Sequence, residues 1–421
     1  MSRGKPSNLR KAAGAVLATL VALSYFSPMQ TALRTLPQHL SLTQGQKQTI
    51  TLGALTLTPS SGSATVSASQ DERLREAGAV DVECAQAGTS ELLLSLMGIP
   101  LRRVEVEVSE EKRLIPGGQA VGVAMRTEGV LIVGVADVQG SDSPARLCGL
   151  RPGDMIYRMN GQDVRSAEEL TAIVSQSGGR GLQVDYLREG KQQSTVLTPL
   201  QDASTGAVRI GAWVRDSTAG VGTLSFYDPE TGSYGALGHA ITDGDTGQIL
   251  SVGEGQILRA DVVGVQKGLR GSPGELKGSF LRDAVTLGDI RRNNILGIYG
   301  QMDTTPSSAL YPEGLPIGLR SGVHTGPATI LSTVDASGVQ AFDVEITRVN
   351  PQSEPAPKSM VIHVTDPDLL EKTGGIVQGM SGSPIIQDGR IVGAVTHVFV
   401  SDPTQGYGLY IDWMLQETGQ T

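Results

Sequence analysis

The stretch GIVQGMSGSPIIQDGRIVGAVTH, residues 375–397, decides how this sequence is interpreted. It contains the pattern G-x-S-G-x-P, in which Ser381 follows Gly379, and glycine permits the tight turn that aims successive backbone N–H groups at one point beside a serine hydroxyl. We therefore expect the N–H groups of Gly379 and Ser381 to form an oxyanion hole. The apolar runs on either side of Asp388-Gly389 predict a β-hairpin. A serine nucleophile at the mouth of this hairpin is one interpretation, and a plain Gly-Ser turn is the other.

Such a serine needs a general base, and the chain has five histidines. His239 is the first candidate, because in YGALGHAITDGDTG an apolar run ends at a Gly-His corner and places the imidazole at a strand end. A histidine that precedes a serine near the carboxyl end resembles chymotrypsin-like peptidases, in which two six-stranded barrels contribute the base and the nucleophile. A structural turn histidine is the alternative. The competing histidines are His324, His363 and His397, of which the last is expected to form a wall of the cleft.

Spacing does not select the carboxylate that would orient the base, because the chain has 43 acidic residues and most acidic side chains are solvated. Asp366 and Asp368 come shortly before the nucleophile loop, in HVTDPDLLEKTGG. The other candidates are Asp243, Asp283, Asp289 and Asp343. By analogy with chymotrypsin-like enzymes, the floor of the specificity pocket falls near Gly375, where no charge stands, so a neutral side chain is expected before the cleaved bond.

A second module precedes this one. GLRPGDMIYRMNGQDV, residues 149–164, predicts a turn, a strand and an Asn-Gly hairpin, and SAEELTAIVSQSG then predicts a helix with Ser166 at its N-cap. Residues 114–198 resemble the PDZ family, which binds an extended peptide as an added strand. The peptide-binding loop is expected in GGQAVGV, with Gly118, Gln119, Val121, Gly122 and Val123. Since this loop departs from the family's commonest sequence, an internal segment is an alternative ligand to a free carboxyl terminus, and a mere spacer domain is the alternative function.

The amino terminus predicts export. Four basic residues precede AAGAVLATLVALSYF, an uncharged run of residues 12–26. Its length suits a signal-peptide core or a short signal anchor, since a full membrane span takes about 20 residues. No A-x-A cleavage site follows, so we expect an uncleaved anchor with everything after Leu40 outside the cytoplasm. A buried soluble helix is the alternative.

Composition excludes several functions. A net charge of −9 argues against a nucleic-acid partner, because such binding depends on cations that neutralise phosphates. Cys84 and Cys148 are too far apart for a metal or catalytic-thiol motif, and whether they pair is not readable. No cofactor or metal is expected. Residues 58–70 predict a flexible linker, SELLLSLMGIP a helix, and RRVEVEVSE a strand, which together suggest a small α/β connector.

The order of anchor, PDZ module and peptidase resembles the family of sporulation signalling peptidases known as stage IV sporulation protein B. The resemblance covers residues 90–421 and rests on IPGGQAVGV, RIGAWVRDSTAGVGTLSFYDPETGSYGALGHAITD, GDIRRNNILGIYG and TDPDLLEKTGGIVQGMSGSPIIQDGRIVGAVTH. It implies Ser381 as nucleophile, His239 as base and Asp366 as the third member of a triad. It also implies a mainly β chain with an anchor (1–40), a linker and connector (41–113), a PDZ domain (114–200) and a chymotrypsin-like double-barrel peptidase (201–421).

The resemblance further implies a biological role. Members are exported across the forespore membrane, cleave themselves free into the space between the two membranes, and then cut a regulator of the membrane metalloprotease that activates a late mother-cell sigma factor. The expected partners are thus protein substrates, including the chain itself, and the membrane. Two other classes remain open: a general extracytoplasmic quality-control serine protease with a PDZ domain, and a catalytically silent PDZ adaptor.

Overall fold

The computed structural model describes residues 39–45, 47–60, 66–109, 111–279, 285–306 and 308–419. The chain divides into two compact units, one ending at Lys112 and also taking in Gly318–Val323, the other holding Arg113–Ile317 and His324–Thr421. The predicted anchor at 12–26 lies outside the described residues. Among the residues that are described, none of the helices combines the length and apolarity that crossing a bilayer would take.

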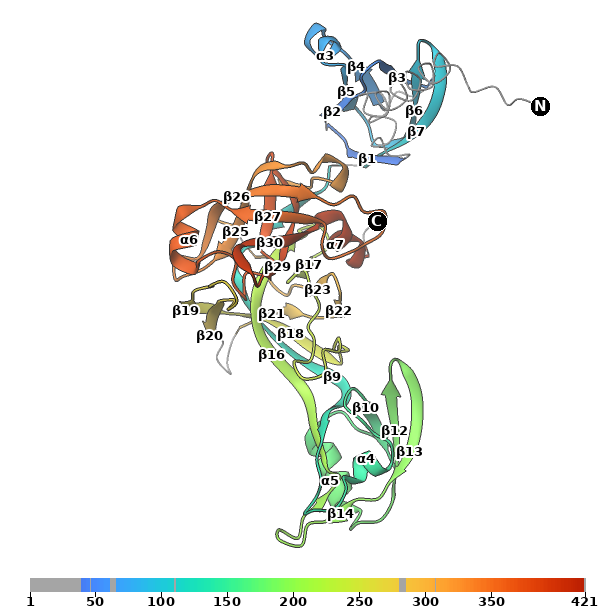
Figure 1. Ribbon diagram of the computed structural model, residues 1–421, viewed down its shortest axis with the longest axis vertical. Helices are drawn as coiled ribbons and strands as arrows, with labels where there is room; N and C mark the ends of the chain where they lie inside the picture. The colour runs from blue at the N-terminus through green and yellow to red at the C-terminus, as the bar shows by residue number, and fades with distance from the viewer. Residues whose placement is uncertain are drawn as a thin grey trace, which may run out of the picture. The chain divides into compact units, whose positions relative to one another are not determined.

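Two small sheets make up the first unit (Figure 1). One has the order β1-β7-β6-β3 and the other β2-β5-β4, and apolar side chains from both form a common core. The elements are β1 (His39–Thr43), β2 (Lys47–Thr51), β3 (Leu55–Pro59), β4 (Val66–Ser69), α3 (Glu72–Glu76), β5 (Ala79–Cys84), β6 (Gly88–Leu96) and β7 (Ile99–Ser109). A 3-10 turn, η1 (Arg320–Gly322), also belongs to this unit.

Two predictions for this region are wrong. SELLLSLMGIP is not a helix, because alternate residues such as Leu92 and Leu94 of β6 are buried on one face in register with β7. The predicted linker at 58–70 overlaps strands β3 and β4, which pair with β6 and β5. The strand predicted for RRVEVEVSE is confirmed as part of β7.

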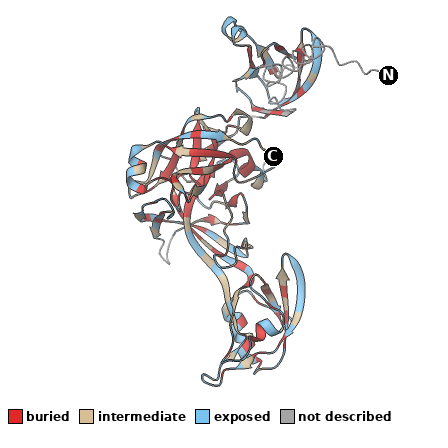
Figure 2. Ribbon diagram, viewed as in Figure 1, coloured by how far each residue is buried: buried red, intermediate tan, exposed pale blue. Residues whose placement is uncertain are grey.

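The carboxyl-terminal half of the second unit is a closed barrel with strand order β25-β26-β27-β30-β29-β28. Figure 2 shows buried residues concentrated in these strands. The hairpin predicted beyond Ser381 is confirmed as β28 and β29. The elements are β25 (Gly326–Thr333), β26 (Val339–Val349), β27 (Met360–Val364), α6 (Pro367–Thr373), β28 (Pro384–Gln387), β29 (Arg390–Phe399), β30 (Asp402–Tyr410) and α7 (Ile411–Glu417).

The rest of the peptidase part is an open sheet among the described residues. Of the two barrels that were predicted, the described residues therefore form one closed barrel. Its core contains Val121, Leu224, Tyr234 and Ile257. The strands are β8 (Arg113–Pro116), β9 (Ala120–Val135), β16 (Ala212–Tyr227), β17 (Ser233–Ala236), β18 (Glu254–Arg259), β21 (Thr286–Asp289), β22 (Arg292–Asn294), β23 (Gly297–Gln301) and β24 (Leu315–Pro316), with a separate hairpin of β19 (Asp261–Gln266) and β20 (Glu275–Ser279).

The PDZ part has its own apolar core, which includes Ile156 and the buried face of α5, Leu170 and Val174. The Ser166 hydroxyl accepts a hydrogen bond from the Glu169 N–H, which confirms the predicted N-cap. The elements are α4 (Pro144–Leu147), β10 (Met155–Met159), β11 (Gln162–Asp163), α5 (Ala167–Gln176), β12 (Leu182–Arg188), β13 (Lys191–Leu197), β14 (Leu200–Gln201) and β15 (Val208–Arg209).

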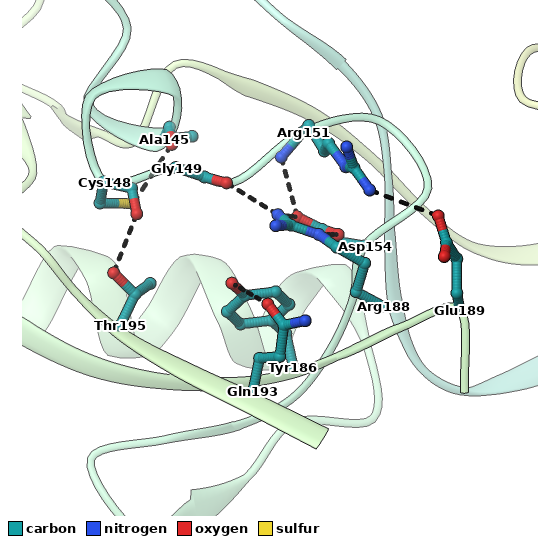
Figure 3. Close-up of polar contacts among 10 residues, drawn as sticks. All are labelled: Ala145, Cys148, Gly149, Arg151, Asp154, Tyr186, Arg188, Glu189, Gln193 and Thr195. Carbon is teal, nitrogen blue, oxygen red and sulfur yellow. Dashed lines mark hydrogen bonds and ion pairs between the residues drawn. The ribbon is translucent and has the colours of Figure 1, made fainter. Parts of the chain in front are cut away.

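A buried ion pair fixes the turn that precedes β10 (Figure 3). The guanidinium of Arg188 donates to both carboxylate oxygens of Asp154, at 2.7 and 2.6 Å, and the Arg151 N–H donates to the same carboxylate at 2.8 Å. Asp154 is fully buried, so this bidentate arrangement replaces the water that its charge has lost. The pair thus joins the start of β10 to the end of β12.

Two long strands, β9 and β16, connect the PDZ part with the peptidase sheet (Figure 1). The first half of β9 pairs with β18, for example Val123 with Ile257, and its second half pairs with β10. β16 runs antiparallel to β9 through both halves. The PDZ part is therefore inserted between two strands of the peptidase sheet.

This pairing corrects the predicted position of the PDZ peptide-binding loop. Gly118, Gln119, Val121, Gly122 and Val123 lie before or within the first half of β9, in the peptidase sheet. Val121 and Val123 are buried in the core of that sheet, because their side chains pack beside those of β16 and β18. These five residues therefore belong to the peptidase sheet, and they do not form the peptide-binding loop of the PDZ part.

Candidate active site

The nucleophile loop is held open by glycine and by one threonine of β16. Gly379 and Gly382 have φ values of +97° and +98°, a region that favours glycine, and a Cβ on Gly382 would lie 2.0 Å from the carbonyl oxygen of Thr223. Thr223 also donates through Oγ1 to the Gly379 carbonyl at 2.7 Å and through its N–H to the Ser381 carbonyl at 3.0 Å. β16 thus sets the conformation of the loop on both sides of Ser381.

This conformation leaves the proposed oxyanion donors unused. Among the described residues, the N–H groups of Gly379 and Ser381 have no hydrogen-bond acceptor, whereas the intervening Met380 N–H donates to Val377. The Gly379 carbonyl accepts from the Thr223 hydroxyl. An oxyanion is stabilised by two free N–H donors that point to one place, and the N–H groups of Gly379 and Ser381, separated by Met380, can serve as this pair.

His239 follows β17 through a tight corner. Leu237 and Gly238 both have φ of +68°, and a Cβ on Gly238 would lie 2.9 Å from a methyl group of Thr396. The His239 Nδ1 hydrogen-bonds to the Ala240 carbonyl at 2.8 Å, which assigns the proton to Nδ1 and leaves Nε2 as an acceptor. Burial lowers the pKa of His239, and the hydrogen bond to Ala240 opposes this shift without cancelling it.

Asn293 holds the segment that follows this histidine. Its side-chain oxygen accepts from the Ile241 N–H at 2.7 Å, and its amide nitrogen donates to the carbonyls of Ile241 and Leu250 at 2.8 Å each. These three hydrogen bonds fix the backbone two residues beyond the imidazole.

Ser381 and His239 line one cavity of about 510 Å³. His397 lines it as well, as predicted, with its ring centroid 5.3 Å from that of His239. Burial, His239 and Lys358 together lower the pKa of His397 to about 4. The Ser381 hydroxyl donates to the Thr396 carbonyl at 2.8 Å, so the serine and the histidine share the cavity without a hydrogen bond between them.

Among the described residues, the hydrogen bond of the His239 imidazole goes to a backbone carbonyl and not to a candidate carboxylate. Asp366 is the N-cap of α6: its side chain accepts from the Leu369 N–H at 2.9 Å and from the Asp343 N–H at 3.2 Å. In the described part of the chain, the hydrogen bonds of the Asp366 carboxylate go to backbone N–H groups and not to His239.

The other acidic candidates have different partners. Asp243 is buried and bonded to Arg215 and Thr246, and Asp289 accepts from Arg291. Asp368 lies in the first turn of α6, and Asp283 lies outside the described residues. The group that holds the Nδ1 of His239 in this structure is the Ala240 carbonyl.

Sequence reasoning missed Thr223 and Asn293, which hold the backbone near Ser381 and His239. Thr223 lies within an alternating strand pattern and offers no signal of its own. Asn293 lies in GDIRRNNILGIYG, a motif that had been recognised without a role for its members. The specificity floor was expected near Gly375, which is buried with φ of +129°, while the next residues, Ile376 and Val377, line the cavity with apolar side chains.

The two free cysteines do not take part in this site. Cys84 is buried in the first unit, and burial raises the pKa of its thiol to about 11. Cys148 lies beside α4, donates to the Ala145 carbonyl at 3.2 Å and also has a pKa raised by burial (Figure 3). Both thiols are protonated at neutral pH and are unpaired with each other.

Comparison with known proteins places this geometry in a family. The family model described as SpoIVB peptidase S55 matches residues 206–415, and a PDZ domain model matches residues 136–188. The chain belongs to the SpoIVB peptidase S55 family. In this S55 peptidase, Ser381 and His239 both fall within the matched peptidase region, and the PDZ match begins after the first half of β9, in agreement with the strand pairing.

Curated relatives match shorter pieces of the chain. A putative zinc metalloprotease of Treponema pallidum is 38% identical over 95 residues, which cover 22% of this chain and 21% of that protein. Zinc metalloprotease RasP of Shouchella clausii is 35% identical over 71 residues, 17% of each chain. The magnetosome formation protease MamE of Paramagnetospirillum magneticum is 39% identical over 70 residues, covering 16% and 9%. The matched pieces thus span about a fifth or less of these proteins.

Solved structures with similar folds include two proteases. The Rv3671c protease from M. tuberculosis, in its active form, is 13% identical with a TM-score of 0.27, covering 48% of this chain and 76% of that one. The HtrA-type protease AlgW with a decapeptide is 11% identical with a TM-score of 0.30, covering 72% and 63%.

Proposed function

We propose that this S55 peptidase is a serine endopeptidase in which Ser381 is the nucleophile and His239 the general base. The observation that carries the proposal is that both side chains line one cavity, beside a glycine loop whose Gly379 and Ser381 N–H groups have no acceptor among the described residues. A turn histidine and an ordinary Gly-Ser turn have no reason to meet in this way.

The reaction begins when the Ser381 hydroxyl leaves the Thr396 carbonyl, to which it donates in this structure, and donates instead to the His239 Nε2. Its oxygen attacks the scissile carbonyl as His239 takes the proton, and the oxyanion is stabilised by the N–H groups of Gly379 and Ser381. His239 then gives the proton to the leaving amine, and water repeats the sequence to release the acyl group. Losing one oxyanion donor costs about 3–4 kcal/mol in such enzymes.

The third role, orienting the imidazole, has two candidates. The resemblance implies Asp366, whereas the hydrogen bond at Nδ1 favours the Ala240 carbonyl. We favour the carbonyl, because it already accepts from Nδ1 in this structure, whereas the hydrogen bonds of Asp366 are those of a helix cap.

We further propose that the chain is exported across the forespore membrane, anchored by residues 12–26, and released by its own activity to cleave a regulator of a membrane metalloprotease during endospore formation. Family membership and the basic flank of the apolar run support this role. Protein substrates, with the chain itself among them, are the expected partners.

The PDZ part offers a place for a peptide that the sequence did not indicate. PDZ domains add a peptide to a strand beside a helix. Here α5 lies beside β16, and the Ala167 N–H at its start donates to the Asp216 side chain at 2.9 Å. We propose that β16 is the strand that receives the peptide. The same strand continues into the cavity, where Thr218, Ala219 and Val221 form a wall.

The decisive experiment replaces Ser381 by Ala and, separately, His239 by Gln. Fluorophosphonate labelling of the intact chain should occur at Ser381, be absent in Ser381→Ala and fall at least about a hundredfold in rate in His239→Gln. Self-cleavage, followed by mass spectrometry of the fragments, should be lost in both. Unchanged fragments in Ser381→Ala would show that the chain is not the protease, and rapid degradation of casein by the parent would favour quality control over signalling.

A further inference from the structure

The cavity contains two imidazoles where one base is enough. His239 reaches it from the corner after β17, and His397 reaches it from β29 of the barrel. Their ring centroids are 5.3 Å apart, with the ring planes inclined at 44°. The proposed chemistry uses only His239, so the position of His397 calls for an explanation of its own.

This spacing is that of two imidazoles on one metal ion. At the Zn–N distance of about 2.0–2.1 Å and a tetrahedral angle, two imidazoles bound to the same zinc ion have ring centroids roughly 5 Å apart. Stacked or edge-on rings reach similar separations, so the hydrogen bonds of each ring have to decide between packing and binding.

The hydrogen bonds favour binding. Histidine ligands of metals usually donate their other ring N–H to a backbone carbonyl or a carboxylate, which fixes the tautomer. His239 does this with the Ala240 carbonyl at 2.8 Å and has its Nε2 unused among the described hydrogen bonds. Neither ring nitrogen of His397 has a hydrogen-bond partner in the described part of the chain, and this residue is exposed to solvent.

We propose that His239 and His397 together bind a divalent transition-metal ion, with zinc the best match, and that the bound ion inhibits the peptidase reversibly. The ion would take the Nε2 of His239, and water or the Ser381 hydroxyl would complete a tetrahedral site. A metallated Nε2 has no lone pair to accept the serine proton, so attack on the scissile carbonyl stops. The binding step is independent of the proposed function, while the inhibition rests on it.

Affinity should be moderate. The site has two protein ligands, and Lys358 places a positive charge over the ring of Tyr407, the residue opposite His397 on β30. We therefore expect a dissociation constant on the order of micromolar, far weaker than that of a structural zinc site with four protein ligands.

Binding is measured on the full chain carrying Ser381→Ala, which keeps both imidazoles and prevents self-cleavage. Isothermal titration with Zn²⁺ at pH 8, and with Co²⁺ followed by its visible absorption, should give one equivalent bound. Adding His397→Gln or His239→Gln should weaken binding at least about tenfold. His324→Gln and His363→Gln are the matched controls, since His324 lies outside the cavity paired with Asp388 and His363 lies on β27.

The outcomes separate the two halves of the proposal. Equal affinity in the parent and in His397→Gln, or loss of the equivalent in His324→Gln, would overturn the binding site. Inhibition is measured by fluorophosphonate labelling of Ser381 with added Zn²⁺, each chain being compared with its own rate in EDTA. The labelling rate of the parent should fall at least about tenfold and that of His397→Gln much less. If zinc binds but does not slow labelling, the proposed inhibition is wrong and the binding site stands. If the parent binds zinc but Ser381 is not labelled even in EDTA, the result counts against the proposed function alone.

Discussion

At the scale of single residues, the cavity is built from side chains whose protonation can be tested. Burial keeps the pKa of His239 below the ordinary value for histidine, about 6.5. The base must be neutral to accept the serine proton, and a lower pKa keeps it neutral in more acidic solution. We therefore expect the acid limb of kcat/KM, measured with a chelator present, to have its midpoint below pH 6.5.

The control for this profile is His324→Gln. His324 lies outside the cavity, and its hydrogen bonds to the Thr325 carbonyl and to Asp388 raise its pKa, which is the opposite direction. Its replacement should leave the midpoint in place. A midpoint of the acid limb above pH 6.5 in the parent would contradict the assignment. It would mean that the base is an exposed imidazole or one beside a carboxylate, and not the buried His239.

Asp366 allows a second test at this scale. Asparagine caps a helix about as well as aspartate, so Asp366→Asn should keep α6 and its melting temperature while it removes the charge. Because the Nδ1 of His239 is held by the Ala240 carbonyl and Asp366 caps α6, we expect kcat to stay within about tenfold of the parent. Removing the carboxylate of a true triad lowers kcat by about 10⁴, and a loss of that size would identify Asp366 as the orienting group. Asp366→Ala, the control for the cap, should lose about 1 kcal/mol of stability.

At the scale of elements, the long strand β16 connects the proposed peptide-binding edge of the PDZ part with the loop that holds Ser381. Its first residues lie beside α5 in the PDZ part, and residues further along hold the nucleophile loop through Thr223. One edge of β16 pairs with β9 along both parts of the strand. In the first residues of β16, the other edge faces α5. A peptide added there would contact the strand that shapes the cavity.

Trp213 reports on that edge directly. It is on β16 with 67% of its surface exposed, whereas the other tryptophan, Trp413, is buried and donates to Gln352. An extended peptide that binds along β16 should cover Trp213 and shift its fluorescence to shorter wavelength, and replacing Trp413 removes the other tryptophan signal. The measurement is a titration of a Trp413→Phe chain with peptides taken from its own sequence. Peptide binding without a change at Trp213 would place the site elsewhere in the PDZ part.

At the scale of the whole molecule, features whose residues lie close together in the sequence could be predicted, and contacts between distant segments could not. The nucleophile loop and its hairpin were predictable because their glycines, turn and strands lie together in residues 375–397. The PDZ helix and its Ser166 cap were predictable for the same reason. The placement of Val121 and Val123 was not, because an alternating strand does not show which of several distant strands it will pair with.

The site divides in the same way. His239 could be proposed from its local corner, but its 5.3 Å approach to His397 depends on how the open sheet meets the barrel. Asp366 was chosen by resemblance, and local sequence equally fits what the structure shows, since an aspartate before Pro367 is a typical helix cap. SELLLSLMGIP was misread because short apolar runs fit a helix and a buried strand alike.

The insertion of the PDZ part predicts which deletions are tolerated. Leu131 and Arg215 are partners in register, so replacing residues 132–214 by an Asn-Gly turn should close β9 and β16 into a hairpin. Deleting residues 114–198 instead removes Leu114, Val121 and Val123, each worth about 1.5–3 kcal/mol of buried surface, together with the pairing of β9. We expect a cooperative melt and labelling of Ser381 in the first chain and neither in the second. A folded second chain would show that β9 is not part of the peptidase sheet.

The distance in sequence between the two halves of the cavity also determines when it can form. The ribosome synthesises the corner that carries His239, just after β17, long before the last barrel strands. The barrel beside Ser381 closes only when β30 has paired with both β27 and β29. A growing chain therefore carries an imidazole and no nucleophile for most of its synthesis. If Ser381 and His239 act as proposed, peptidase activity can therefore arise only when translation is nearly finished.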